Sequence, residues 1–340
     1  MINRILHAGV LTILAALVAV PLNAAAQASR TRSATHPATS LLASLPESDA
    51  VALVKVKRAL DEAMPRLLAS NPAKLAAANA QIDQFKERTG IDPRGFDEVA
   101  FGIHYTYPRE GITKLESIGL ARGTFSAAAM VAAGKIAANG KYREEKRQGK
   151  TIYIFNLDQE IRLFGLINFK VGEFAASPLD SNTLAIGDPA SVRNVIDVNR
   201  GRKRASAELV ALASRDPEAI AGFGGNISPA LLQSLDIGNQ AIAQDLSTIR
   251  QVYGSVVVSE TNVEMFFAAR TTNAEAAKNL GDTLEGLKQL GALFVTRLPA
   301  AKSTLAKSAL NNLKITIQAN ELQVRTAVAQ SAIAPLMGGL

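Results

Sequence analysis

The stretch PESDAVALVKVKRALDEAM, residues 46–64, sets the pattern from which the fold of this chain is predicted. Its apolar segment VALVKV, residues 51–56, has the length and β-branched content of a buried strand. The sequence from Arg58 to Leu68 then has helical character. An acidic turn, a short strand and a helix therefore follow one another in this part of the chain.

The same succession returns in the second half. Residues 215–235, RDPEAIAGFGGNISPALLQSL, again give an acidic turn, a buried strand and the start of a helix. Two further pairs keep the same order along the chain, LARGTFSAAAMVAAG (120–134) with AARTTNAEAAKNLG (268–281), and SNTLAIGDPASVRNVI (181–196) with ANELQVRTAVAQSAIAPL (319–336). In the first of these pairs, Arg122 and Arg270 each end a strand before a helix. Three matches in one order predict an internal duplication, and chance similarity of alanine-rich helices is the alternative.

Local signals place the elements within each half. Asn71 before Pro72 predicts a helix start, and Gln148-Gly149 predicts the turn of a hairpin. Thr272 with Glu275 predicts a capping box for a long helix. Gly222, Gly224 and Gly225 lack the pattern of a dinucleotide site and indicate close backbone packing or a bulge.

The interleaved strands and helices predict the α+β class. We expect two similar units with mixed or antiparallel sheets and with helices packed on one face of each sheet. The other face would pack on its twin or bind a partner. The expected segments are a signal peptide (1–28), a flexible leader (29–45), a first α+β unit (46–204) and a second α+β unit (205–340).

The first residues have the organisation of a secretory signal peptide. Arg4 supplies the positive end, residues 8–20 form an apolar stretch, and Ala26 and Ala28 occupy the small-residue positions of a cleavage site before Ser29. An uncleaved anchor helix, the alternative, needs about twenty apolar residues in a row. We therefore expect an exported chain that is periplasmic or extracellular and soluble after cleavage, with no transmembrane anchor left.

Composition narrows the class of protein. The chain has no cysteine, so neither a disulfide nor a lipid-modified cysteine is available to it. Hydrophobic residues make up 48% of the chain but there is no Trp, which predicts an aliphatic core. The formal charge of +7 becomes +6 when Arg4 leaves with the signal peptide. Outside the cytoplasm, such a surface meets anionic envelope components rather than nucleic acid.

The patterns of known catalytic and metal sites are missing from the sequence. After signal cleavage two histidines remain, His36 and His104, and there is no G-x-S-x-G or S-x-x-K motif. Gly149-Lys150-Thr151 ends like a phosphate-binding loop, but Glu144 stands where the first glycine is needed. The sequence therefore predicts no catalytic residue, no cofactor and no metal site, and it predicts that His104 is a satisfied or solvent-facing residue of a strand.

One dense cationic run separates the two units. It consists of Arg200, Arg202, Lys203 and Arg204. Cations are expected at the end of a helix in any case, so a solvated linker is one interpretation. The other interpretation is a site for an anion.

Three segments of the first half carry a resemblance to a group of exported bacterial proteins that share a domain of unknown function. They are ESDAVALVKV (47–56), GKTIYIF (149–155) and LAIGDPASVRNVIDVNRG (184–201). The resemblance implies an envelope location and a duplicated α+β fold, and it implies no reaction.

These observations favour a non-catalytic envelope protein that binds or scaffolds another component, either an envelope protein or an anionic envelope component. A carrier of an apolar ligand or lipid is the first alternative, and its cavity would be lined by residues such as Leu163, Phe164, Ile167 and Phe169. A hydrolase built around His104 is the second alternative. No pattern in the sequence indicates an oligomeric state.

Overall fold

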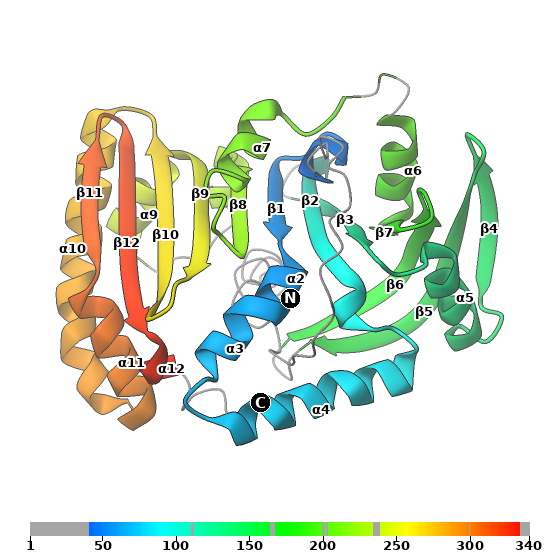
Figure 1. Ribbon diagram of the computed structural model, residues 1–340. Helices are drawn as coiled ribbons and strands as arrows, with labels where there is room; N and C mark the ends of the chain where they lie inside the picture. The colour runs from blue at the N-terminus through cyan, green and yellow to red at the C-terminus, as the bar shows by residue number, and fades with distance from the viewer. Residues whose placement is uncertain are drawn as a thin grey trace.

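Strands from both halves of the described chain form one antiparallel sheet. The structure is a computed structural model, and it describes residues 41–109, 112–163, 167–198, 201, 203–233, 239–298 and 300–333. In these residues twelve strands form a single sheet in the order β11-β12-β10-β9-β8-β1-β2-β3-β7-β6-β5-β4. Figure 1 shows the sheet crossing the molecule from β11 to β4, with α4 along its lower border. The predicted α+β class is confirmed.

The elements have the following bounds. The strands are β1 (Ala50–Val54), β2 (Phe96–Arg109), β3 (Ile112–Gly123), β4 (Tyr142–Arg147), β5 (Lys150–Leu163), β6 (Ile167–Pro178), β7 (Thr183–Gly187), β8 (Ala221–Asn226), β9 (Ile249–Val258), β10 (Asn262–Thr271), β11 (Lys314–Gln318) and β12 (Glu321–Ala329). The α-helices are α2 (Val56–Arg58), α3 (Met64–Leu67), α4 (Pro72–Thr89), α5 (Ala127–Ala137), α6 (Pro189–Val198), α7 (Ala207–Ala213), α8 (Pro229–Gln233), α9 (Gln240–Ser247), α10 (Ala274–Phe294), α11 (Ala300–Asn311) and α12 (Gln330–Ile333). The short helical turns are η1 (Leu41–Ser44), η2 (Ala59–Ala63), η3 (Pro93–Gly95) and η4 (Val295–Arg297).

Most of the predicted start and turn signals hold. The Asn71 side chain accepts a hydrogen bond from the Lys74 backbone N–H at the start of α4. Gln148 and Gly149 both have positive φ, at 50° and 76°, as a two-residue hairpin turn requires. The start of α10 is corrected by one residue, because Asn273 rather than Thr272 caps it and accepts from the Ala276 N–H. Asn is one of the residues preferred at the N-cap, because its side-chain oxygen can accept a hydrogen bond from the first turn of the helix.

The two predicted units share the sheet and follow the same strand order. The first contributes β1-β2-β3-β7-β6 and the second β8-β9-β10-β12-β11, and the first adds β5 and β4 at its outer end. Strand β1 lies between β2 and β8, so the units join by the antiparallel pairing of Ala50–Val54 with 221–225. A common order is what a duplication requires, and the duplication itself stays a prediction.

The two faces of the sheet are named by residues of neighbouring strands. Face A carries Leu53, Ala100, Leu120 and Ala185, which lie opposite one another across the strands. These side chains belong to the main core. Other members of that core come from η1 and the residue after it, and from α6 and α7: Leu41, Leu42, Leu45, Val192, Val195, Ile196, Leu209 and Leu212. Face A is therefore covered over the central strands.

Helices also pack on the opposite face, face B, so the expectation of helices on one face of each sheet is wrong in this respect. In the first unit, Ala127 and Val131 of α5 pack on Phe155 and Leu184, which point to face B. In the second unit, Leu280 of α10 packs on face B. The reason is that strands such as β5 carry apolar side chains on both sides, for example Ile154 and Phe155, and both sides need cover.

Glycines in β8 allow α7 to lie close to face A. A Cβ added to Gly222 would stand 2.1 Å from the Ala213 carbonyl oxygen, and one added to Gly224 would stand 3.1 Å from the Leu209 carbonyl oxygen. The predicted close backbone packing at these glycines is confirmed. No helix within the described residues is long and apolar enough to cross a membrane.

We expect Gly222→Ala to destabilise the protein by about 1–3 kcal/mol, because α7 must move away from β8 to make room for the methyl group. The control is Gly286→Ala. Gly286 lies within α10 with no atom within 4 Å of the added Cβ, so this change should stabilise by up to about 1 kcal/mol. Urea unfolding of both variants measures the difference, and an unaltered Gly222→Ala protein would contradict the packing argument.

Candidate functional site

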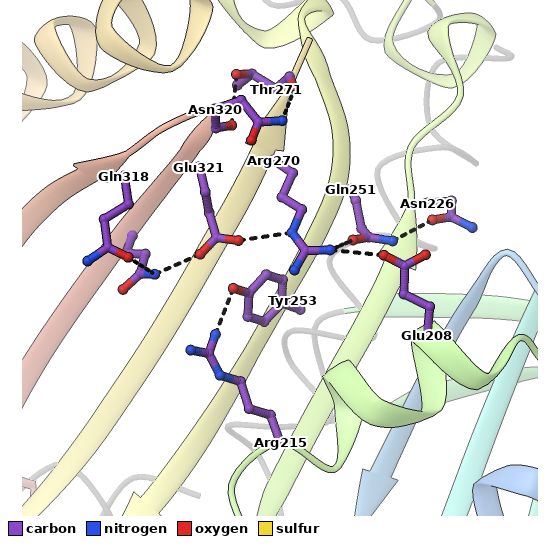
Figure 2. A network of polar contacts seen from close by, with 11 residues as sticks. Glu208, Arg215, Asn226, Gln251, Tyr253, Arg270, Thr271, Gln318, Asn320 and Glu321 are labelled. Carbon is purple, nitrogen blue, oxygen red and sulfur yellow. Dashed lines mark hydrogen bonds and ion pairs between the residues drawn. The ribbon is translucent and has the colours of Figure 1, made fainter. Parts of the chain in front are cut away.

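A network of polar side chains lies on face A of the second unit, and Arg270 is at its centre. Figure 2 shows the Arg270 guanidinium between Glu321 of β12 on one side and Gln251 and Glu208 on the other. Arg270 donates to Glu321 at 2.9 Å, to Gln251 at 2.7 Å and to Glu208 at 2.9 Å. These contacts join β9, β10 and β12 to α7.

Below this guanidinium lies the ring of Tyr253, which is 1% exposed. The Arg270 guanidinium carbon stands 5.4 Å from the ring centre. The Tyr253 hydroxyl accepts a hydrogen bond of 2.7 Å from Arg215, whose guanidinium also lies over the Tyr253 and Phe266 rings. A buried tyrosine thus receives both a donor for its oxygen and cations over its ring.

The charges of the network shift the pKa values of its members. Burial raises the pKa of Tyr253, and its hydrogen bond with Glu321 raises it further. Burial also acts to raise the pKa of Glu321, but hydrogen bonds from Tyr253, Arg270 and Gln323 outweigh this, so that the pKa of Glu321 is lowered. Hydrogen bonding to Glu321 raises the pKa of Arg270. These directions keep Glu321 ionised and Tyr253 neutral, which suits a structural network more than proton transfer.

Sequence reasoning identified Arg270 only as a strand end, and it missed the network. Arg122, its predicted counterpart, lies on the same face and stands 3.7 Å from Glu98. Arg270 faces Glu321 in the pairing of β10 with β12, and side chains that face each other across two paired strands point to the same side of the sheet. The contact could therefore be predicted from the sequence only if the pairing of β10 with β12 were already known.

A row of apolar residues crosses face B over the central strands. We call these seven residues the apolar row. They lie opposite one another on consecutive strands: Phe267, Gly254, Phe223, Ala52, Phe101, Gly119 and Ile186. Large side chains occupy every second strand and Gly or Ala occupies the strands between. With strands about 4.8 Å apart, the row is about 29 Å long.

The rings of the row lie over the glycines. A Cβ at Gly254 would approach the Phe223 ring to 2.7 Å, and a Cβ at Gly119 would stand 3.6 Å from the Phe101 ring. The Phe223 and Phe267 ring centres are 6.3 Å apart although a strand lies between them. The aromatic rings therefore fill the depressions over the glycines and make the surface even.

Three of the seven residues of the row are exposed, although they lie on inner strands of the sheet. Phe101 is 41% exposed, Ile186 38% and Phe267 36%. On face A of the same strands, Ala100 and Leu120 are fully buried. Contiguous apolar surface left open in this way is characteristic of interaction sites.

Exposed apolar side chains also lie on α10, which packs on the same face of the sheet through Leu280. Leu287, Leu290 and Phe294 recur at helical spacing and are all exposed. They follow Thr283 on one side of the helix, and Thr283 hydrogen-bonds Asp245 of α9. The exposed side chains therefore lie on the side of α10 that carries Thr283.

His104 is the histidine on which a hydrolase was considered. Its Nδ1 lies 2.8 Å from an oxygen of Asp49, and the same oxygen accepts from the Tyr105 backbone N–H. In the described part of the chain no hydroxyl is recorded in contact with the other ring nitrogen. His104 is therefore a strand residue whose Nδ1 has a partner, in agreement with the prediction.

The cationic run is described only in part. Arg200 and Arg202 lie outside the described residues. Lys203 is exposed, and its Nζ stands 3.5 Å from a carboxylate oxygen of Glu47. The backbone of Arg204 pairs with that of Pro46 in an isolated antiparallel β-bridge. The anion site predicted for this run stays a prediction.

Other predicted positions also fall where the structure gives no description. Ala26, Ala28 and Phe164 lie outside the described residues, and the side chains of Leu163, Ile167 and Phe169 are not described. Among the residues that are described, no group of three or more His, Asp or Glu side chains is arranged to hold a metal ion.

Comparison with known proteins gives a resemblance in fold only. No protein-family model matches the chain, and no curated protein matches it. Among solved structures, crystal forms III, I and IV of TP0453 align with TM-scores of 0.46, 0.44 and 0.42 and with 9%, 10% and 8% identity. Each alignment covers 88% of this chain and 98%, 97% and 96% of TP0453, respectively. We transfer no property of TP0453 to this chain.

We expect Glu321→Gln to cost about 1–2 kcal/mol of stability at neutral pH, because the variant loses the charged partner of Arg270. The folded state lowers the pKa of Glu321, so its contribution is present above the ordinary value of 4.5 and is lost as the pH falls through the lowered value. The gap between wild type and variant should therefore narrow in acid. Urea unfolding over a pH series measures it, with the exposed Glu264→Gln as control, and a gap constant down to acid pH would contradict the assignment.

Proposed function

We propose that this protein is a non-catalytic, exported component of the cell envelope that binds another envelope protein through the apolar row on face B. The observation that carries the proposal is the exposure of Phe101, Ile186 and Phe267 on inner strands whose other face contributes Ala100, Ala185 and Ala268 to the main core. Leaving these side chains in water is unfavourable, and a partner with an apolar face removes that cost.

The evenness of the row favours a protein partner. Small-molecule sites are usually concave, whereas protein interfaces combine a broad apolar centre with aromatic anchors. The Phe223 and Phe101 rings lie over Gly254 and Gly119 and so fill the places where a ligand would otherwise sink into the sheet.

A carrier of an apolar ligand or lipid is the second candidate. The same row favours it, because a chain of CH₂ groups would also be removed from water by lying along Phe267, Phe223 and Phe101. The two candidates differ in what contacts Phe101 in the cell.

Envelope location belongs to the proposal as well. It is supported by the signal-peptide pattern of residues 1–28 and by the resemblance of 47–56, 149–155 and 184–201 to exported bacterial proteins. The net positive charge makes an anionic envelope component a further partner to consider beside the protein.

Photo-crosslinking distinguishes the two candidates. A photoreactive phenylalanine analogue placed at Phe101 in the producing cell should give a covalent adduct with another protein. Phe85 of α4, which is 39% exposed, is the matched control position and should give none. Adding Phe267→Gln to the chain that carries the probe should lower the adduct yield. A lipid adduct would support the carrier instead, and equal adducts at both positions, or none, would contradict both candidates.

Export predicts a defined N-terminus. Protein recovered from the envelope fraction should begin at Ser29, which N-terminal sequencing or intact-mass measurement determines. The variant with Ala26→Arg and Ala28→Arg should accumulate uncleaved. Wild-type protein that retains Met1 and stays in the cytoplasmic fraction would refute the envelope location.

A further inference from the structure

The two edges of the sheet differ in how they are protected. At one edge, β4 carries charges at every position from Arg143 to Arg147. Four of these five side chains form ion pairs with other parts of the chain: Arg143 with Glu173, Glu144 with Lys135, Glu145 with Arg193 and Arg147 with Asp197. Charged edge strands resist pairing with other chains, and this edge is closed in that way.

At the other edge, β11 has the sequence KITIQ and carries one charge, on Lys314. Four of its five residues are exposed, and Ile317 is 42% exposed even though part of its side chain lies on Gly281 of α10. A β-branched, nearly uncharged edge strand is a template for another strand.

The register of β11 determines which backbone groups are free. Residues 319–320 form a two-residue turn, and Gln318 faces Glu321 as the closing pair. In such a hairpin the closing pair exchanges both backbone hydrogen bonds, and so does every second pair after it. Lys314, Thr316 and Gln318 therefore bond to β12, whereas the N–H and C=O groups of Ile315 and Ile317 point away from the sheet.

We propose that the edge strand β11 pairs with β11 of a second copy of this chain, in antiparallel register about a two-fold axis at Thr316. In this register Ile315 of each copy faces Ile317 of the other, and the four free backbone groups of each strand are satisfied. The two Thr316 side chains meet as the central pair, and Lys314 faces Gln318. No like charges oppose each other, and a two-fold axis makes the contact self-complementary.

The same register on β4 would be repulsive. It would place Glu145 against Glu145 and, twice, Arg143 against Arg147, and like charges directly opposite destabilise a strand pair. These three like-charged pairs outnumber the two opposite-charged pairs of Glu144 with Lys146. The proposal is therefore specific to one edge. Because a short strand supplies the contact, we expect a weak dimer that forms as the protein concentration rises.

Sedimentation equilibrium of the purified protein tests the pairing. The wild type should show a reversible monomer–dimer equilibrium, and Thr316→Lys should weaken it at least several-fold, because it places two lysines opposite each other. Thr316 is exposed on the sheet, so this change should leave folding intact. Thr316→Ser is the neutral control and should associate like the wild type.

Single cysteines test the register, since the chain has none of its own. The central residues of an antiparallel pair without mutual backbone bonds have Cα atoms about 4.5 Å apart, which a disulfide spans. Mild oxidation of Thr316→Cys should therefore give a covalent dimer. In Lys314→Cys and Gln318→Cys the thiols would stand roughly 14 Å from their copies, and these variants should cross-link far less.

Two results would overturn the proposal. The first is wild-type protein that stays monomeric at every concentration. In that case a strand of a different protein would be the remaining candidate to pair with β11. The second is a dimer that Thr316→Lys does not weaken and whose cysteine variants cross-link equally, which would place the contact elsewhere.

Discussion

The antiparallel pairing of β1 with β8 is the contact on which the rest of the structure depends. It joins strands from the two halves of the chain, and it makes one twelve-stranded sheet out of what would otherwise be two separate ones. Every pair in this contact contains an Ala or a Gly, for example Ala50 with Gly225 and Ala52 with Phe223. Small side chains at this junction let α7 come close to one face and keep the opposite face even. The exposed apolar row crosses the junction and exists only because the two halves are continuous.

The two faces of the sheet differ in how far helices cover them. Face A is closed over the centre by η1, α6 and α7, and it holds the largest group of fully buried side chains. Over the second unit it becomes polar, and the Arg270 network fastens α7 to β9, β10 and β12. Face B has cover from α5 and α10 at its two ends and from η2 and α3 over Val258 and Val263, while Phe101 and Phe267 are left exposed. Stability is thus concentrated on one face, and the other is left for interaction.

Sequence patterns were sufficient for the local structure, because the signals there are local. Asn71, Gly149 and the glycines of β8 each act within a few residues or through their lack of a side chain, and each was found where the pattern predicted it. The strand order of the sheet depends on which strands meet, which no single segment encodes, and α11 was not anticipated at all. The apolar row could not be predicted from the sequence for the same reason. Phe101 and Phe223 look like ordinary core residues, and only the placement of the helices leaves them uncovered.

The central place of β1 has a consequence for the order in which the chain assembles. This strand is near the start of the described chain, but one of its two neighbours, β8, belongs to the second half. A chain that emerges from its N-terminus first therefore carries an unsatisfied strand until residues 221–226 arrive. During that interval the backbone N–H and C=O groups on the β8 side of β1, around Val51, can pair with a strand of another chain. A truncated product that ends before β8 would therefore be prone to aggregate, because its β1 edge would have no partner strand.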